Sequence, residues 1–272
     1  MGYLTTDKKK ITAKTLLEMK AAGEKITQMT AYDFTTAGII DAAGIDSILV
    51  GDSASNVMAG NQDTTPITVD QMIYHARAVV RACHHCLVVC DMPFGSYQVS
   101  REDGIRNAIR IIKETGVGAV KMEGGKEIAD TVKGIVDAGI PVIGHLGLTP
   151  QSIHKFGGYG LRAKEDTEVE KLIEDALALD AAGVSGITLE KVPAAVANKV
   201  TAMVKAATIG IGAGNGTDGQ VLVYADALGM TSGFKPKFLR HFANVNKCMT
   251  EGVMEYIRCV KSESFPSEAE SY

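Results

Sequence analysis

The chain has 272 residues, of which 46% are hydrophobic and 22% are charged, and its formal net charge is -4. This length suits one large α/β domain, and the acidic balance without a basic stripe argues against nucleic-acid binding. The first residues lack the apolar core of a signal peptide, and no run approaches the roughly 18 apolar residues of a membrane span. We therefore expect a cytoplasmic protein without membrane contacts.

Short apolar, β-branched runs alternate with amphipathic segments along the chain, which is typical of βα units on a parallel sheet. An extra helix is predicted first, at 12–23, covering one end of the sheet. Strands are predicted at 25–31, 47–51, 87–91, 119–123, 141–145, 186–190, 208–212 and 220–224, and helices at 68–83, 101–115, 126–138, 167–182 and 193–205. Eight strands close a (β/α)8 barrel, so we predict a TIM barrel.

The residues that end the predicted helices and connect the elements support the same fold. The pairs Ala43-Gly44, Ala138-Gly139 and Ala182-Gly183 are expected to end helices, because glycine suits the left-handed residue that follows a helix. The last crossover is too short for a helix. Helical patterns continue after Gly233, so we expect one catalytic domain over 1–260 and a mobile tail over 261–272.

Polar side chains close five successive predicted strands. These are Asp52 and Ser53, then Asp91, then Lys121 and Glu123, then His145, and finally Glu190. Each has an ordinary explanation by itself, since an Asp after a strand is often a helix cap and a lone His is often a core residue. Active sites of α/β barrels lie at the C-terminal ends of the strands, so the coincidence of all six charged or titratable groups favours a functional site.

The residue types favour a site for a hard cation. Mg2+ prefers oxygen ligands and takes one or two carboxylates directly, which makes Asp52 and Asp91 the natural ligands. Glu123 is expected to reach the ion directly or through water. A 2-oxo acid could chelate the same ion, with Lys121 and His145 offsetting the negative charge, which leaves Glu190 for proton transfer.

Two other motifs are weaker evidence for a functional site. Cys83 and Cys86, with Cys90 nearby, imitate a metal cluster, but no second ligand pair follows at zinc-site spacing, so we assign no metal there and expect free thiols. The glycine-rich stretch 209–216 fails the spacing of a dinucleotide loop. It is interpreted as a strand end whose small residues let a ligand approach the backbone.

Seven stretches resemble the ketopantoate hydroxymethyltransferase family. They are MTAYD (29–33), VGDS (50–53), DMPFGSY (91–97), VKMEGG (120–125), PVIGHLGLTPQS (141–152), LEKVP (189–193) and IGIGAG…DGQVLV (209–223). The resemblance implies a (β/α)8 barrel assembled as a homo-decamer, dependent on Mg2+, in pantothenate and coenzyme A biosynthesis. It implies transfer of a hydroxymethyl group from 5,10-methylenetetrahydrofolate to 3-methyl-2-oxobutanoate.

Carried over by motif, the resemblance also implies residue roles. Mg2+ would be bound by Asp52, Asp91 and Glu123, the oxo acid would be contacted by Asp52, Ser53, Asp91 and Lys121 beside His145, and Glu190 would accept the proton. No folate contacts are assigned. The loops 160–168 and 214–218 depart from the family pattern, which puts the folate side in doubt rather than the chemistry at Mg2+.

Three alternatives stay open. The first is another Mg2+-dependent 2-oxo-acid barrel of the lyase or mutase kind, although those enzymes use a catalytic cysteine loop that we do not find here. The second is a class I aldolase that forms a Schiff base on Lys121. The third is a barrel that binds a ligand without turnover.

Overall fold

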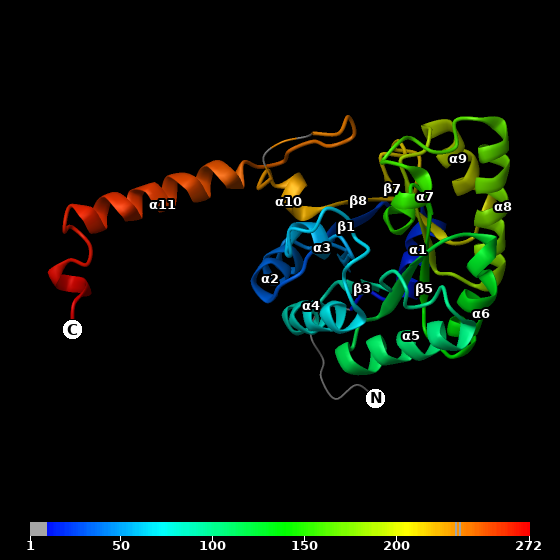
Figure 1. The fold of residues 1–272 in the computed structure, drawn as a ribbon, viewed down its shortest axis with the longest axis horizontal. Helices are drawn as coiled ribbons and strands as arrows, with labels where there is room; N and C mark the ends of the chain where they lie inside the picture. The colour runs from blue at the N-terminus through cyan, green and yellow to red at the C-terminus, as the bar shows by residue number, and fades with distance from the viewer. Residues whose placement is uncertain (1–9, 232, 234) are drawn as a thin grey trace. The chain divides into compact units, whose positions relative to one another are not determined.

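The first part of the chain is a closed barrel of parallel strands. The computed structural model describes residues 10–231, 233 and 235–272. Internal contacts divide the chain into two units, Met1–Leu222 and Val223–Tyr272. In the first unit the strands pair in chain order from β1 to β8, and β8 pairs with β1 (Figure 1). The predicted (β/α)8 barrel is therefore confirmed. Within the described ranges, no helix has the length and apolar character needed to cross a bilayer.

The bounds of the elements in the first unit follow in chain order. They are α1 Ala13–Ala22, β1 Ile26–Thr30, α2 Phe34–Ala42, β2 Ser47–Val50, α3 Ala54–Val57, α4 Val69–Ala82, β3 Leu87–Asp91, α5 Arg101–Thr115, β4 Ala119–Glu123, η1 Lys126–Ile128, α6 Ala129–Asp137, β5 Val142–Gly147, η2 Pro150–Ser152, α7 Ile153–Phe156, α8 Asp166–Ala182, β6 Gly186–Glu190, α9 Ala194–Met203, β7 Ala207–Ile211 and β8 Gly219–Leu222.

The observed strands lie within two residues of the predicted ones. The bounds of β3, β4 and β6 coincide with the prediction, and β3 and β4 are buried along their whole length. The prediction for β7 is shifted by one residue because Gly212 has a φ of 64° and leaves the strand. The prediction for β8 ended too late because Tyr224 begins a helix. No helix separates β7 from β8, as the short crossover predicted.

Helix α1 closes the N-terminal end of the barrel, as expected. Its side chains Leu16 and Met19 are buried in one cluster with residues from the starts of the strands, among them Ile26 and Leu87. The ammonium group of Lys20 adds a hydrogen bond of 2.9 Å to the carbonyl oxygen of Ala206 at the start of β7. With this end covered, the C-terminal end of the strands remains for a site.

The predicted helix ends at Ala-Gly pairs are confirmed by the backbone. Gly44, Gly139 and Gly183 have φ angles of 88°, 87° and 93°. Any other residue at these positions would place its Cβ against the neighbouring carbonyl oxygen, so glycine ends the helix at the lowest cost.

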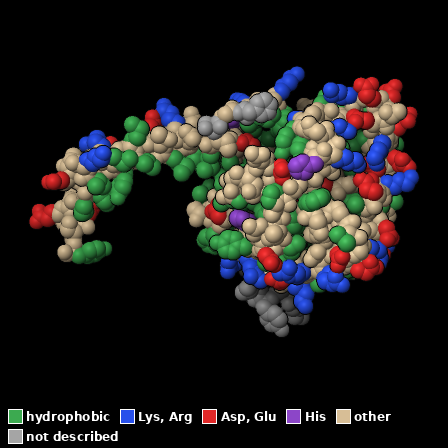
Figure 2. Space-filling model, in the orientation of Figure 1, with side chains coloured by type: hydrophobic (Ala, Val, Ile, Leu, Met, Phe, Trp, Pro, Cys, Tyr) green, Lys and Arg blue, Asp and Glu red, His purple; other side chains and the backbone are tan. Residues whose placement is uncertain are grey.

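The second unit contains α10 Tyr224–Ala227, α11 Val245–Lys261 and η3 Glu268–Glu270. Helix α11 has no buried residue, and an apolar series along it is exposed: Met249, Val253, Met254, Tyr256, Ile257 and Val260. Figure 2 shows hydrophobic side chains gathered along one side of this helix. The expected catalytic domain over 1–260 and the mobile tail over 261–272 stay predictions.

Candidate active site at the barrel mouth

Strand register brings the predicted polar residues to the C-terminal end of the barrel. Asp91 and Glu123 are the last residues of β3 and β4, and Glu190 is the last residue of β6. Asp91 is paired with Lys121 across β3 and β4, and Glu123 is paired with His145 across β4 and β5. Because side chains alternate along a strand, Lys121 and Glu123 point to the same face.

A buried ion pair joins two of the strands. The Nζ atom of Lys121 lies 2.7 Å from Oδ1 of Asp91, and the backbone N–H of Asp52 donates to Oδ2 of Asp91 at 2.9 Å. Burial, with the negative charges of Asp91 and Glu123, raises the pKa of Asp52 well above its ordinary value. Burial lowers the pKa of Lys121, but Asp91, Glu123 and Asp52 outweigh it and raise that pKa. The cluster thus holds more acidic groups than one ammonium can balance.

His145 lies between two of the carboxylates. Its Nδ1 is 3.0 Å from Oε1 of Glu123, and its Nε2 is 3.3 Å from Oε2 of Glu190. Burial and the Lys121 cation lower the pKa of His145, but Glu123 and Glu190 outweigh them and raise the pKa to about 9. The side chain of Glu190 is 16% exposed, so it is the most accessible carboxylate of the group.

Ser53 lies at the edge of this group. Its hydroxyl is 2.7 Å from the hydroxyl of Tyr32, a residue of the loop after β1. A Cβ atom on Gly51 would meet the Ser53 Oγ at 2.7 Å, so the glycine leaves room for this hydroxyl beside Asp91. The structure therefore brings all seven sequence-predicted side chains to one end of the barrel.

The strand-end pattern missed two residues: Gln151, which bonds two of the carboxylates, and Tyr97, which bonds Gln151. The amide of Gln151 donates to Oδ2 of Asp52 at 2.9 Å and to the carbonyl oxygen of Met92 at 3.0 Å. Its backbone N–H donates to Oε2 of Glu123 at 2.9 Å, and its Oε1 accepts from the Tyr97 hydroxyl at 2.8 Å. Tyr97 and Gln151 follow β3 and β5, and the only sequence signal for them is that each lies in a stretch shared with the family, DMPFGSY and PVIGHLGLTPQS.

A family model described as ketopantoate hydroxymethyltransferase matches residues 10–268. The chain belongs to the ketopantoate hydroxymethyltransferase family. Relatives named 3-methyl-2-oxobutanoate hydroxymethyltransferase include one from Flavobacterium johnsoniae, 58% identical over all of both chains. One from Bacteroides fragilis (strain YCH46) is 56% identical over 100% of this chain and 99% of that protein. The predicted family is therefore confirmed.

Solved structures with a similar fold carry other names. A phosphonopyruvate hydrolase in complex with oxalate and Mg2+ has a TM-score of 0.62 at 11% identity, covering 96% of this chain and 93% of that one. A 2,3-dimethylmalate lyase of the PEP mutase/isocitrate lyase superfamily has a TM-score of 0.60 at 15% identity, covering 94% and 89%. At these identities the likeness concerns the barrel fold alone.

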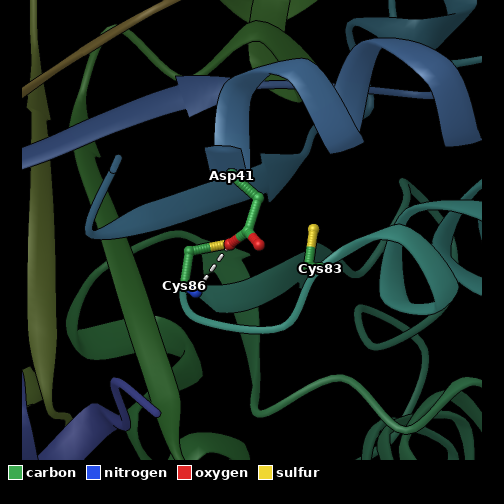
Figure 3. A group of neighbouring side chains, drawn as sticks. All are labelled: Asp41, Cys83 and Cys86. Carbon is green, nitrogen blue, oxygen red and sulfur yellow. Dashed lines mark hydrogen bonds between the residues drawn. The ribbon is translucent and has the colours of Figure 1, made fainter. Parts of the chain in front are cut away.

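This ketopantoate hydroxymethyltransferase family member also contains a buried thiol cluster away from the barrel mouth. Asp41, Cys83 and Cys86 have candidate ligand atoms within 4.8 Å of one another, and Figure 3 shows the carboxylate beside the two thiols. The carboxylate of Asp41 accepts hydrogen bonds from the backbone N–H groups of His84 (2.9 Å), His85 (3.3 Å) and Cys86 (2.8 Å). Sequence reasoning missed Asp41, and these bonds give it a structural role. That no metal binds at Cys83 and Cys86 stays a prediction.

In this family member, side chains from elsewhere in the chain pack against the glycines of the stretch 209–216. A Cβ atom on Gly210 would meet Oγ1 of Thr217 at 2.7 Å, and one on Gly214 would meet the Cβ of Ala194 at 2.5 Å. The close approach expected from a ligand is thus made by the chain itself at these two positions.

Proposed function

We propose that this protein transfers a hydroxymethyl group from 5,10-methylenetetrahydrofolate to 3-methyl-2-oxobutanoate with the help of Mg2+. The product would be 2-dehydropantoate, a precursor in pantothenate and coenzyme A biosynthesis. Two observations support the proposal: membership of the family over residues 10–268, and the cluster of Asp52, Asp91 and Glu123 at the barrel mouth. The second observation supports the proposed metal-assisted reaction most directly.

The donor set fits Mg2+. Asp52, Asp91 and Glu123 are at most 6% exposed and offer only oxygen ligands, which suits a hard cation. Among the described residues Oδ1 of Asp91 is buried and accepts no hydrogen bond, although the ammonium group of Lys121 lies 2.7 Å away. We therefore assign direct coordination to Asp91 and to its neighbour Asp52, whose backbone N–H donates to the other oxygen of Asp91. Both oxygens of Glu123 already accept hydrogen bonds, which favours its contact through a water. When bound, Mg2+ would polarise the ketone of the oxo acid and stabilise negative charge on its oxygen.

The remaining groups would hold the oxo acid. We propose that its carboxylate and ketone oxygens contact Asp52, Ser53, Asp91 and Lys121, and that His145 lines the site. Lys121 is fixed by its ion pair with Asp91, so its ammonium can offset the substrate's charge without moving. The same ion pair argues against a Schiff base on Lys121, because an amine must lose its proton before it attacks a ketone.

Glu190 is the group that we assign to proton transfer. It lies at the end of β6 beside His145 and is more exposed than the other carboxylates, so it is free to meet a substrate C–H bond. Glu190 would remove the C3 proton of the oxo acid. The enolate would then form a carbon–carbon bond to the methylene carbon of the folate iminium, and water would replace the folate nitrogen on that carbon, which releases tetrahydrofolate.

The backbone around Glu190 supports a fixed position. Lys191 has a φ of 45°, an unusual angle for a residue other than glycine. Its N–H donates to the Ile211 carbonyl at 2.9 Å, and its carbonyl accepts from the Arg162 N–H at 2.8 Å. Strained residues of this kind persist where neighbouring contacts hold them and cluster at functional sites.

We further propose that the protein acts in the cytoplasm as a homo-oligomer, with a decamer as the expected assembly. The apolar side of α11 supports self-association, because large exposed apolar patches mark interaction surfaces.

The direct test is an activity assay with 3-methyl-2-oxobutanoate and 5,10-methylenetetrahydrofolate. We expect 2-dehydropantoate to form with Mg2+, activity to fall to background after EDTA, and excess Mg2+ to restore it. Turnover of both substrates that is unaffected by EDTA would refute the metal assignment, and no product with Mg2+ present would refute the proposed reaction.

A further inference from the structure

A second compartment adjoins the carboxylate cluster. A cleft of about 240 Å³ lies among the loops after β3 and β5, η1, α7 and the first half of α8. Glu123 lines it, and so do Gln151 and Tyr97, which are hydrogen-bonded to Glu123 and to each other. Asp52, Asp91 and Lys121 do not line it. A ligand in the cleft would therefore lie against the oxo-acid site without filling it.

The cleft also reaches the side of the site that holds the proposed base. Gly147 lines the cleft at the end of β5 and is paired with Glu190 on β6. A Cβ atom on Gly147 would lie 2.3 Å from the Glu190 carbonyl oxygen, so the two strand ends are in contact there. The cleft thus runs from Glu123 to the strand end that carries Glu190.

Two flat surfaces, an aromatic ring and a stacked guanidinium group, line this cleft among several charged side chains. Phe94 is 50% exposed, although it lies in the loop directly after the buried strand β3. Across the same lining, the guanidinium group of Arg162 lies over the Phe156 ring at 4.2 Å from its centroid. Aromatic rings and a stacked guanidinium are surfaces on which a flat heteroaromatic ring can stack.

We propose that this cleft binds the ring system of the one-carbon donor, a reduced pterin, with Phe94 as its main stacking surface. The inference rests on the proposed function, because a transfer reaction needs its donor beside the acceptor carbon. The cleft of about 240 Å³ is smaller than the roughly 300–1,000 Å³ of pockets that bury a whole drug-sized ligand, so we expect it to hold the bicyclic ring and to leave the glutamate tail toward solvent. Ring binding here would bring the methylene carbon to the side of the oxo-acid site that Glu123 and Gly147, the strand partner of Glu190, form.

The test separates donor binding from the chemistry on the oxo acid. Phe94→Ala removes the stacking ring, Phe94→Tyr keeps it, and Tyr74→Ala is the matched control because Tyr74 is 74% exposed on α4 and does not line the cleft. For each variant we would measure the Kd for tetrahydrofolate, the KM for each substrate, and the exchange of the C3 proton of 3-methyl-2-oxobutanoate in D2O without folate. Circular dichroism melting would confirm that each variant is folded.

We expect Phe94→Ala to raise the Kd for tetrahydrofolate and the KM for the donor by roughly fivefold or more. Its proton exchange and its KM for the oxo acid should stay within twofold of the unmodified protein, as should every value for Phe94→Tyr and Tyr74→Ala. Unchanged donor affinity in Phe94→Ala would overturn the inference, and so would an equal loss of proton exchange. Failure of the unmodified protein to turn over its substrates would refute the proposed function separately, while the tetrahydrofolate Kd would still test the cleft.

Discussion

The side-chain amide of Gln151 donates a hydrogen bond to Asp52 at 2.9 Å, although the two residues are 99 positions apart in the chain. The backbone N–H of the same glutamine donates to Glu123. One residue of η2 therefore holds two carboxylates that we assign to Mg2+, and it fixes the orientation of both.

Gln151→Leu should weaken Mg2+ binding. The variant keeps the backbone bond to Glu123 but leaves Oδ2 of Asp52 without its donor, and loss of such an orienting partner typically lowers metal affinity about 10–100-fold. Titration calorimetry with Mg2+ would measure the change. Tyr74→Ala serves as the control, and a variant with unaltered Mg2+ affinity would show that Gln151 does not orient the ligands.

Lys121→Met should raise the KM for the oxo acid by about tenfold or more, because it leaves Asp91 without its cation and removes a charge that faces the substrate.

Borohydride treatment of the unmodified protein with 3-methyl-2-oxobutanoate should trap no adduct. A covalent mass increase on Lys121 would instead support the aldolase mechanism.

Asp41→Asn should destabilise the fold in a pH-dependent way. Burial raises the pKa of Asp41, but the backbone N–H groups of His84, Cys86 and His85 outweigh it and lower the pKa. A carboxylate with a lowered pKa adds stability above its unfolded pKa of about 3.9, and that stability is lost as the pH falls through the folded value. At pH 7 the variant should lose about 1.5–3 kcal/mol of unfolding free energy in urea, the range for hydrogen bonds to charged groups.

The difference between Asp41→Asn and the unmodified protein should shrink as the pH falls below about 4. Asp130→Asn is a suitable control because the Asp130 side chain is 86% exposed, and it should change stability by less than about 1 kcal/mol. A constant difference between pH 7 and pH 3 would mean that the charge of Asp41 does not contribute.

The cysteines should react in two classes. Cys248 is exposed and Cys259 is half-buried, whereas Cys83, Cys86 and Cys90 are buried. Hydrogen bonding to Cys83 and burial raise the pKa of the Cys86 thiol, and burial raises the pKa of the Cys90 thiol, so neither supplies much thiolate. Replacing Cys248 and Cys259 with serine should abolish the fast reaction of the native protein with DTNB. A remaining fast phase would contradict the burial of Cys83, Cys86 and Cys90.

Strand register explains why much of the site was predictable. Parallel strands in a closed barrel end at one rim, so a residue such as Glu190 can be placed once its strand is recognised. Gln151 lies in the short helix η2 and Tyr97 in a loop, and their contacts depend on the conformations of the segments after β5 and β3, which hydrophobic periodicity does not specify. The approach of Asp41 to Cys86 depends on the packing of α2 against the turn after α4, which no local pattern encodes.

The central claim is that Glu190 takes the C3 proton of an oxo acid held at the barrel mouth. The most direct measurement is the rate of C3 proton exchange of 3-methyl-2-oxobutanoate in D2O with Mg2+, followed by NMR, for the unmodified protein and Glu190→Gln. Since a general base contributes about 10²–10⁴-fold, we predict that the variant exchanges at least about 100 times more slowly while binding the oxo acid with similar affinity. Exchange at the unmodified rate would contradict the claim.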